Sequence, residues 1–547
     1  RWAGVEKEFH RTEHGEINIV HEAVDRWAEC PEKKDQTALV YEKAGAISAF
    51  TYQDLKEISC KWAHLLSRHG FNAGDRLFIF LPTCPEAYFA MLGCARIGVI
   101  FCNVYPTLGI HEMEWRLENG EPRGVLTNPD LVEVLPRKAM RGSKAVLLTG
   151  GEAPGLFAWE TVVPDMLERM PDEAEIRWLP PEAPLYMLYT SGSTGPSKAA
   201  VHAHQDMAGY LMTGRYVLDL GEDSILWTDA SPAWVTGSVY GAFAPWLCGA
   251  TSVVQGDPFS ASTWYRTLER HRISVWYTTP RTIKGLMHSG EDLPTRYDLS
   301  SLRHIASVGE KLPAELLYWA RRNLGHSAHD TWWMTETGMI CIANYPCDQI
   351  KPDSMGKPVP GVEAAVLDPN GHQLPAFTLG ELGLKAGWPS MMKAIWRDRE
   401  RYSNYFRGHW FMTGDMVIKD EDGYYYHHGR NDDLIKAGQG FVGPYEIEEL
   451  LRLHMDVADA AVVSKCSESG SPTMKAFVTV RGGVTPSDRL SREIKAFVQP
   501  KLPAELTLTE IRFLDELPKT SSGKIVRRAL RAIDLGLPSG NVSRLQE

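Results

Sequence analysis

Short apolar runs alternate with longer helical patterns along most of the chain. The runs are rich in β-branched and aromatic residues, which is typical of buried strands. The predicted strands are 75–81, 252–254, 274–278 and 304–308. The segments 85–97 and 313–324 have the composition and length of helices. Because helices follow or separate the strands, the pattern predicts an α/β fold with largely parallel sheets.

The most apolar stretch of the chain, 77–105, is interrupted by Pro82, Pro85, Glu86 and Arg96. A membrane-spanning helix needs about 20 consecutive, predominantly apolar residues. We therefore interpret this stretch as a buried strand, a turn and a packed helix, and we predict no membrane span.

The pattern changes after Asp415. The segment 419–426 predicts a tight turn leading into a strand, and the short polar segment 428–433 predicts a linker. The remaining part of the chain is long enough for a small α+β domain. Its predicted elements are helices at 446–453 and 492–498 and strands at 460–464 and 476–480.

Length and charge narrow the class of protein. With 547 residues, the chain is too long for one ordinary core, and we expect at least two domains. The formal net charge of −11 disfavours a nucleic-acid-binding protein, which would carry a broad basic surface. The nine cysteines form no CxxC pair and no zinc-ligand pattern. This usage favours free thiols in a reducing compartment, and we expect a cytoplasmic protein.

A run of small and hydroxyl residues, Tyr189-Thr-Ser-Gly-Ser-Thr-Gly-Pro-Ser-Lys198, follows a strand-like segment. Such a run lets the backbone turn tightly, so that N–H groups and hydroxyls can converge on phosphate oxygens. It lacks the Gly-x4-Gly-Lys-Ser/Thr spacing of a P-loop, which disfavours a P-loop kinase or ATPase. On composition alone, a flexible surface loop is the alternative.

Three further motifs carry groups that suit a nucleotide. The segment 330–338, Asp-Thr-Trp-Trp-Met-Thr-Glu-Thr-Gly, combines flat rings with hydroxyls and a carboxylate that could hold a nucleotide and Mg²⁺. Asp415 closes a strand-like run and could accept both ribose hydroxyls. The segment 518–528 places a lysine after Ser-Gly, where it can supply a positive charge. Judged singly, each is more simply a core strand, a turn cap or a solvated basic segment.

In their order and spacing, the four motifs resemble the adenylate-forming enzymes, which include acyl-CoA synthetases, peptide-synthetase adenylation domains and beetle luciferases. The resemblance covers nearly the whole chain and is strongest to AMP-forming acetyl-CoA synthetases. It implies a large N-terminal ATP- and acyl-binding domain, 1–431, built of several subdomains with layered sheets and helices. It also implies a small C-terminal α+β lid, 432–547, that turns about a hinge at Asp432.

The same resemblance implies two half-reactions. A carboxylate first attacks the α-phosphorus of ATP to give acyl-AMP and diphosphate, and the thiol of coenzyme A then displaces AMP. Fixed donors and Mg²⁺ stabilise the charge that develops on the phosphoryl oxygens. Thr335 is placed near the α-phosphate and Glu336 near Mg²⁺, and Lys524 neutralises charge during adenylation. These three are the expected catalytic residues.

The residues expected to bind the nucleotide fall into three groups. Those around the phosphates are Thr190, Ser191, Gly192, Ser193, Thr194, Gly195 and Lys198, those around adenine are Gly309, Glu310, Lys311, Asp330, Thr331 and Trp332, and those at the ribose are Asp415 and Arg430.

The acyl pocket of acetyl-CoA synthetases has counterparts in Trp234, Val235, Thr236, Val308 and Trp333. Trp333 fills the space that longer acyl chains would need, and relatives that take longer acids commonly have Gly at its position. We therefore expect acetate as the substrate, with propionate tolerated. One methylene changes discrimination by only about 1–3 kcal/mol, so we do not expect absolute selectivity.

The chain departs from the pattern of its relatives at several positions. The phosphate loop ends Gly-Pro-Ser-Lys-Ala-Ala where Pro-Lys-Gly is usual, and Met334 replaces a common Gln. Phe441 occupies the place of an Arg that assists with the phosphates. Because an uncharged ring cannot stabilise diphosphate, we hypothesise that the enzyme tolerates the reverse direction, from acyl-CoA, AMP and diphosphate to ATP.

Three alternatives remain. A medium-chain or aromatic acyl-CoA synthetase is disfavoured by Trp333. A peptide-synthetase adenylation domain is disfavoured because no carrier domain follows and no acidic residue is evident for a substrate amine. A non-catalytic nucleotide-binding member of the fold is disfavoured by Glu336, Asp415 and Lys524, whereas Phe441 keeps it open. The sequence marks neither the coenzyme A contacts nor the oligomeric state.

Overall fold

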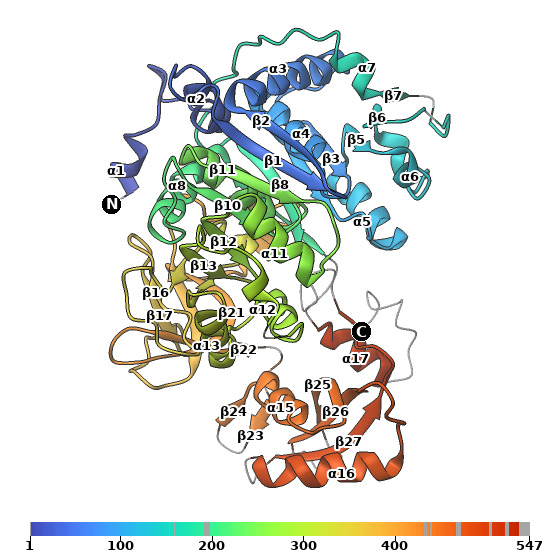
Figure 1. Cartoon of the computed structure of the whole chain (residues 1–547), viewed down its shortest axis with the longest axis vertical. Coiled ribbons are helices and arrows are strands. Elements are labelled where there is room, and N and C mark those ends of the chain that lie inside the picture. The colour runs from blue at the N-terminus through green and yellow to red at the C-terminus, as the bar shows by residue number, and fades with distance from the viewer. Residues whose placement is uncertain are drawn as a thin grey trace.

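The protein is layered in its larger part and carries a smaller lobe near its C-terminal end, as Figure 1 shows for the computed structural model. The structure describes residues 2–152, 154–157, 159–190, 197–290, 292–431, 433, 435–437, 440–466, 472–502, 506–519 and 525–534. Within these ranges, no helix combines the length and the apolar character needed to cross a membrane.

The first sheet carries much of the predicted site at one edge. Within the described ranges it has nine strands, which in spatial order are β16 (Lys357–Pro358), β15 (Ile342–Ala343), β14 (Ala328–Trp332), β13 (His304–Ser307), β12 (Val275–Thr278), β10 (Ile225–Thr228), β11 (Thr251–Gln255), β1 (Thr37–Lys43) and β2 (Ala46–Thr51). The strands from β14 to β1 pair in parallel, whereas β2, β15 and β16 are antiparallel additions. The predicted largely parallel α/β sheet is therefore confirmed.

The second sheet is also mostly parallel. Its eight described strands, in spatial order, are β19 (Ala394–Ile395), β9 (Lys198–Ala203), β8 (Pro184–Thr190), β4 (Ile100–Val104), β3 (Arg76–Phe80), β5 (Gly124–Thr127), β6 (Ala145–Leu148) and β7 (Glu160–Val162). Strands β8 and β9 are antiparallel, and Thr190 pairs directly with Lys198. A hydroxyl and a lysine therefore stand side by side where these two strands pair.

A third, antiparallel sheet completes the large part. Its described strands are β17 (Ala364–Leu367), β18 (Gly380–Lys385), β21 (Trp410–Lys419), β20 (Phe406–Arg407) and β22 (Tyr425–Arg430). The pairing of β21 with β22 places Asp415 opposite Arg430. The predicted linker at 428–433 is thus wrong for its first three residues, because they extend β22. The composition of these residues gives no strand signal, and the strand is stabilised by backbone pairing with β21.

Helices cover these sheets. The longer ones in the large part are α3 (Tyr52–Arg68), α4 (Pro85–Ile97), α5 (Ile110–Gly120), α8 (Met207–Tyr216), α11 (Ala261–Arg270), α12 (Pro280–Met287) and α13 (Ala314–Asn323). Helix α3 begins with a capping box in which Thr51 and Asp54 bond each other's backbone N–H groups. It packs closely on α4 because Gly93 has no side chain; a Cβ there would lie 2.3 Å from Cβ of Trp62.

The smaller lobe contains its own sheet, drawn in orange and red in Figure 1. Its elements are the hairpin β23 (Ile435–Ala437) and β24 (Gly440–Val442), the strands β25 (Val457–Cys466), β26 (Pro472–Val480) and β27 (Thr507–Phe513), and the helices α15 (Pro444–Arg452), α16 (Asp488–Val498) and α17 (Arg527–Asp534). The predicted α+β character of this part is confirmed. The boundary at 432 stays a prediction, since Asp432 lies outside the described residues.

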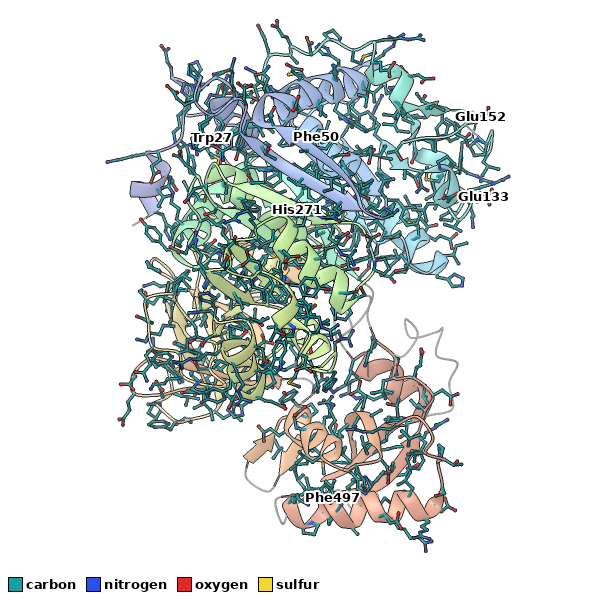
Figure 2. The ribbon with its side chains drawn as sticks, in the orientation of Figure 1. Trp27, Phe50, Glu133, Glu152, His271 and Phe497 are labelled. Atoms are coloured by element: carbon teal, nitrogen blue, oxygen red, sulfur yellow. The ribbon has the colours of Figure 1, made fainter. Side chains whose placement is uncertain are left out.

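Each of the two parts is filled by its own buried apolar clusters. A large cluster joins both parallel sheets, with Leu39 of β1, Phe101 of β4 and Tyr277 of β12 among its fully buried members. The small lobe has its own cluster, which includes Val462 of β25 and Ile494 of α16. The sticks in Figure 2 show side chains filling both parts. Each part therefore has the buried surface that an independent folding unit needs.

Candidate active site

A cavity of about 1320 Å³ is lined by residues of both the large part and the small lobe. Most of the predicted site residues that the structure describes line it, namely Thr190, Lys198, Trp234, Val235, Gly309, Glu310, Lys311, Asp330, Thr331, Trp332, Trp333, Thr335, Glu336, Asp415 and Arg430. Thr236 and Val308 are buried beside cavity-lining neighbours but do not line it themselves. The predicted residues Ser191, Gly192, Ser193, Thr194, Gly195, Asp432 and Lys524 lie outside the described residues.

A buried carboxylate lines the cavity beside two of the residues predicted to bind the phosphates. Glu336, in the short helical turn Thr335–Thr337, has only 4% of its surface exposed. Its Oε1 atom lies 2.9 Å from Nζ of Lys198 and accepts hydrogen bonds from the hydroxyls of Thr190 (3.3 Å) and Tyr405 (3.0 Å). Burial alone would raise the pKa of Glu336, but the charge and hydrogen bond of Lys198, together with a backbone hydrogen bond and the charge of Arg430, lower it. The carboxylate is therefore ionised at neutral pH.

The turn that carries Glu336 is itself anchored from β9. The ring of His202 lies between two acceptors, with Nε2 at 2.7 Å from the carbonyl oxygen of Thr335 and Nδ1 at 2.7 Å from Oδ2 of Asp206. His202 and Asp206 are fully buried. One strand, β9, thus contacts the turn twice, through Lys198 at the carboxylate and through His202 at the backbone.

A second buried carboxylate, Asp415, lies at the end where the ribose is expected. Its Oδ1 atom accepts a hydrogen bond from Arg430 (2.9 Å), and its Oδ2 atom accepts one from the indole N–H of Trp332 (2.8 Å). Burial opposes ionisation, but Arg430, together with His427 and Trp332, holds the pKa of Asp415 well below its usual range. Asp415 is therefore a fixed anion that can accept hydroxyl hydrogen bonds.

Asp330 differs from these two carboxylates because, among the residues that the structure describes, no cation forms an ion pair with it. It accepts hydrogen bonds from the backbone N–H groups of Thr331 (3.1 Å) and Leu312 (3.5 Å). Burial raises the pKa of Asp330 to about 8, against an ordinary value of 3.8. At neutral pH this group is largely a protonated acid, so it can donate as well as accept a hydrogen bond.

Aromatic residues are prominent among those predicted to form the acyl pocket. Trp333 is 9% exposed, and its indole N–H donates to the hydroxyl of Tyr277 at 3.0 Å. Trp234 packs its ring edgewise on Tyr105, with the ring centroids 5.3 Å apart. Val235 follows Trp234 at the start of a short helical turn, Val235–Ser238. The walls here are rigid and apolar, which suits a small acyl group.

Several cavity residues had no sequence signal. Tyr405 contacts both partners of the central ion pair, since its hydroxyl bonds Glu336 and the ammonium of Lys198 lies 4.5 Å from its ring centroid. Arg281 and Lys284 of α12 add positive charge to the cavity wall. The sequence places them far from the predicted motifs, and only the fold brings them to the same cavity.

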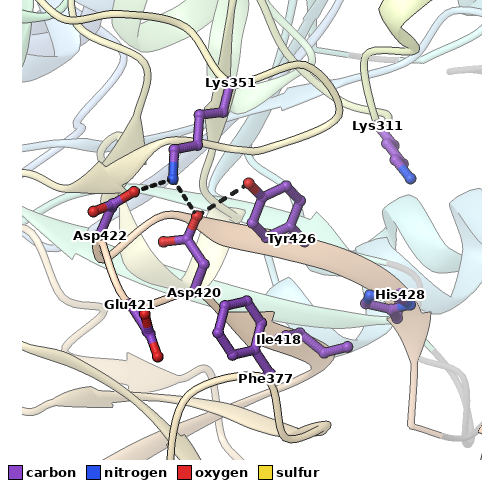
Figure 3. A pocket seen from close by; sticks show the side chains of 9 residues that line it. All are labelled: Lys311, Lys351, Phe377, Ile418, Asp420, Glu421, Asp422, Tyr426 and His428. Carbon is purple, nitrogen blue, oxygen red and sulfur yellow. Dashed lines mark hydrogen bonds and ion pairs between the residues drawn. The ribbon is translucent and has the colours of Figure 1, made fainter.

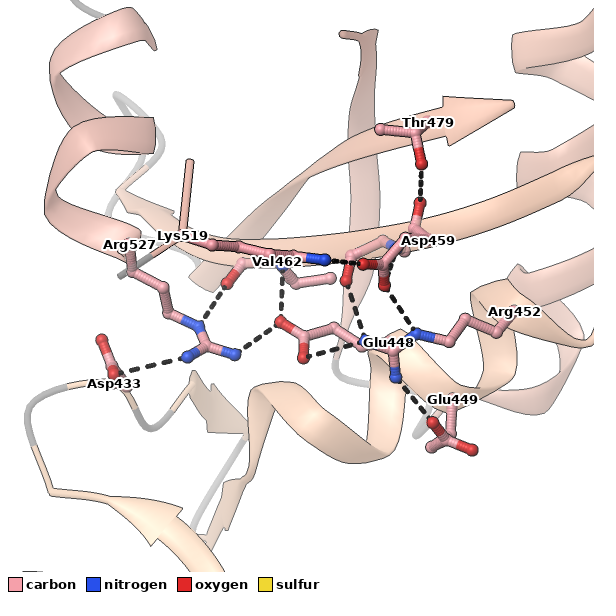
Figure 4. A network of polar contacts seen from close by, with 10 residues as sticks. Asp433, Glu448, Glu449, Arg452, Asp459, Val462, Thr479, Lys519 and Arg527 are labelled. Carbon is pink, nitrogen blue, oxygen red and sulfur yellow. Dashed lines mark hydrogen bonds and ion pairs between the residues drawn. The ribbon is translucent and has the colours of Figure 1, made fainter. Parts of the chain in front are cut away.

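The small lobe borders the cavity with a network of charged residues, shown in Figure 4. Glu448 of α15 is 2% exposed and accepts hydrogen bonds from Arg527 (2.6 Å) and from the N–H of Val462 (2.9 Å). Lys519 pairs with Asp459 at 2.5 Å. Because Ile525 and Val526 also line the cavity, the segment that immediately follows Lys524 faces it.

A smaller cavity of about 510 Å³ adjoins the main one and is shown in Figure 3. Lys311 and His428 line both cavities. Inside it, Nζ of Lys351 donates to Asp420 (2.6 Å) and Asp422 (2.5 Å). These contacts join the segment around Lys351 to the β21–β22 turn. The two aspartates of the turn therefore already have a cationic partner within the protein.

Comparison with known proteins agrees with this geometry. The chain matches the AMP-binding enzyme model over residues 25–396 and the AMP-binding enzyme C-terminal domain over residues 446–524. An acetyl-coenzyme A synthetase of Bacillus subtilis is 43% identical over 97% of the chain and 93% of its own length. One from Methanothrix soehngenii is 34% identical over 98% of the chain and 85% of its own length.

Solved structures share the fold. A crystal structure of an anthranilate CoA ligase in complex with anthranoyl-AMP has a TM-score of 0.84 at 28% identity, covering 95% of this chain and 98% of that one. A benzoate CoA ligase from Burkholderia xenovorans has a TM-score of 0.81 at 26% identity, covering 94% of this chain and all of the other.

The chain belongs to the family of AMP-binding enzymes. As its motifs predicted, it is an AMP-forming acyl-CoA synthetase that works with ATP, Mg²⁺ and coenzyme A.

Proposed function

We propose that the acid activated by this enzyme is acetate, which gives acetyl-CoA, AMP and diphosphate through acetyl-AMP. The observation that carries the proposal is one cavity lined by two kinds of group. Ionised Glu336 and Lys198 are part of its polar lining, and the buried indole of Trp333 is part of its aromatic lining. The acetyl-coenzyme A synthetases of Bacillus subtilis and Methanothrix soehngenii, with which the chain shares 43% and 34% identity, support the same acid.

In the first half-reaction, an acetate oxygen attacks the α-phosphorus, the bond between that phosphorus and the β-bridging oxygen breaks, and diphosphate leaves. The donors that we assign to the phosphates are Thr190, Lys198 and Thr335. They line the same cavity, where they can stabilise the charge that develops on the phosphoryl oxygens. Holding both reactants in line removes several kcal/mol of entropic cost, to order of magnitude.

Glu336 fits the role of a Mg²⁺ ligand. Mg²⁺ prefers oxygen ligands and is commonly bound by one or two carboxylates together with substrate phosphates. Glu336 is ionised and lies at the cavity wall beside the hydroxyl of Thr190. When bound there, the metal would neutralise charge on the phosphates. Lys198, now paired with Glu336, can turn to a phosphate oxygen as the nucleotide enters.

The nucleoside part of ATP is assigned to the opposite wall. Asp415, fixed by Arg430 and Trp332, can accept hydrogen bonds from the ribose hydroxyls. Asp330 and the backbone around Gly309 are assigned to adenine. A protonated Asp330 offers a donor to a ring nitrogen and an acceptor to the amino group of adenine.

In the second half-reaction, the thiol sulfur of coenzyme A attacks the acetyl carbonyl carbon, AMP leaves, and the thiol proton passes to solvent. We propose that the chain divides into domains 1–431 and 432–547 and that the second domain turns about Asp432 between the half-reactions. Lys524 would act in the first of them. The separate apolar core of the small lobe supports such a movement as a rigid body.

Trp333 is the residue that favours acetate over larger acids. The structural neighbours include ligases for anthranilate and benzoate, so an aromatic acid is the second candidate. An aromatic acid needs open space where the buried indole of Trp333 stands. We further propose the cytoplasm as the compartment, since the eight cysteines whose side chains are described are free thiols.

The experiment that tests the proposal separates the half-reactions. With Mg²⁺, acetate and ATP but no coenzyme A, we expect exchange of labelled diphosphate into ATP. Adding coenzyme A should convert acetate to acetyl-CoA with one AMP for each thioester. Exchange that does not require acetate, or AMP that forms without acetyl-CoA, would contradict the proposal.

A further inference from the structure

The indole of Trp333 is the first member of a buried chain of hydrogen bonds. Its N–H lies 3.0 Å from the hydroxyl of Tyr277, which lies 2.8 Å from Oγ1 of Thr331. That hydroxyl in turn lies 2.7 Å from the carbonyl oxygen of Ser307. All four residues are buried. The chain begins at the acyl wall and ends at the residue directly before Val308.

The direction of every hydrogen bond in this relay is fixed. The carbonyl oxygen of Ser307 can only accept, so the single proton of the Thr331 hydroxyl points to it. Tyr277 must then donate to Thr331, which leaves its own oxygen free to accept from the indole of Trp333. Each hydroxyl donates once and accepts once. The indole plane is therefore held by a relay that has no second arrangement of protons.

Tyr240 supports the same two rings from the side. Its ring meets Trp333 edge-on with centroids 5.0 Å apart and meets Tyr277 edge-on at 5.5 Å. Its hydroxyl accepts from the N–H of Ile340 (2.9 Å) and pairs with Thr213 (2.8 Å). Tyr240 is thus fixed at both its ring and its hydroxyl, and it limits how far the other two rings can tilt.

We infer that Tyr277 is a specificity-determining positioning residue, whose hydroxyl holds the indole of Trp333 across the acyl pocket and so sets the pocket's depth. The inference rests on the proposed function. Tyr277 is not among the residues that line the cavity, so it acts on the acid only through Trp333. Without the hydroxyl, the buried indole N–H has no partner in the relay, and the indole gains by turning toward another acceptor.

The variant Tyr277→Phe removes one oxygen and keeps the ring. Leaving the buried indole N–H without a partner favours a turned indole and a deeper pocket. We therefore expect the ratio of kcat/KM for butyrate to that for acetate to rise roughly tenfold. The variant also changes the contact with Thr331, a residue predicted to bind adenine. Any effect of that change on ATP binding is the same with both acids and cancels in the ratio. A loss of stability alone would lower both values together and leave the ratio where it was.

Two further variants make the test specific. Tyr210→Phe removes another buried hydroxyl, which pairs only with Tyr186 in the described contacts and lies outside the cavity lining, and it should leave the ratio unchanged. Trp333→Phe removes the N–H that starts the relay. In that background, Tyr277→Phe should have no further effect on the ratio. If Tyr277→Phe alone does not fold, Thr331→Val breaks the relay instead by removing the acceptor of the Tyr277 hydroxyl, and the ratio must then exceed that of the wild type.

The outcomes separate the inference from the proposed function. Wild-type turnover of acetate is measured first, and its failure overturns the proposed function itself. If acetate is used but Tyr277→Phe leaves the ratio unchanged, or if the full shift persists in the Trp333→Phe background, the relay does not set the pocket's depth. A shift that vanishes in that background supports it.

Discussion

The substitution Glu336→Gln isolates the charge of the central carboxylate. An amide oxygen can still accept from Thr190 and Tyr405, so the two neutral hydrogen bonds to Oε1 can persist. What is lost is the ion pair with Lys198 and the anionic ligand proposed for Mg²⁺. Lys198 keeps about 11% of its side chain exposed at the cavity wall, so water can solvate part of its charge. We therefore expect a stability loss of about 2 kcal/mol, below the range for a fully buried pair.

The effect on catalysis should be larger than the effect on folding. Loss of a metal ligand and of one fixed charge is expected to lower kcat/KM for Mg–ATP on the order of 100-fold. The assay is acetate-dependent diphosphate exchange, titrated with Mg²⁺, and the variant should require more Mg²⁺ for half-maximal rate. Tyr405→Phe is the control, because it removes one hydrogen bond from the same carboxylate and leaves its charge. An unchanged Mg²⁺ dependence in Glu336→Gln would refute the assigned role.

Three other predictions follow from particular contacts. The pKa of Asp330 is about 8 in the fold and 3.8 ordinarily, so between about pH 4 and 8 the unfolded chain loses a proton that the folded chain keeps, and stability falls with rising pH. Without nucleotide, the melting temperature of Asp330→Asn should rise relative to that of the wild type as the pH increases across that window. A difference in melting temperature that does not depend on pH would contradict this prediction. Phe441→Arg should raise the turnover number for adenylation several-fold more than that for ATP formation, while the equilibrium stays fixed; equal effects in both directions would end the hypothesis. Glu448→Ala removes the buried acceptor that Nη2 of Arg527 and the N–H of Val462 share, and it should cost about 3 kcal/mol in urea unfolding. The adjacent, half-exposed Glu449→Ala should cost under about 1 kcal/mol, and similar losses would refute the assigned importance of this network.

Helix α4 shows what local sequence can predict. The predicted segment 85–97 agrees with the observed helix at both ends. Pro85 occupies the first helical turn, where a missing N–H costs nothing, and Gly98 ends the helix in the left-handed region with φ of 77°. Both signals lie within the segment and need no tertiary contact.

Strands with polar faces were harder to predict. Strand β27, Thr507–Phe513, was not anticipated, because its apolar residues Leu508, Ile511 and Phe513 do not alternate regularly with polar ones and its pairing with β26 is non-local. The same reason accounts for the residues of β22 that were taken for a linker. A strand at the margin of a sheet owes much of its stability to backbone pairing, which the side-chain pattern does not report.

Sequence motifs predicted the residues of the site, but they did not predict the residues that hold those side chains in place. The motif residues Thr190, Lys198 and Glu336 meet because the hairpin β8–β9 and the turn after β14 end at one edge. Tyr277 and Tyr405 lie in no motif, and their partners Trp333 and Glu336 are distant in sequence. Only the fold reveals such contacts.

The claim that the acid is acetate has one direct test. The wild-type enzyme is given ATP, Mg²⁺ and coenzyme A with acetate, propionate, butyrate, hexanoate or benzoate in turn, and the acyl-CoA formed is measured by chromatography. Because we propose that the buried indole of Trp333 closes the acyl pocket, we predict the highest kcat/KM for acetate, a lower value for propionate, and little turnover of hexanoate or benzoate. A higher kcat/KM for hexanoate or benzoate than for acetate would contradict this account.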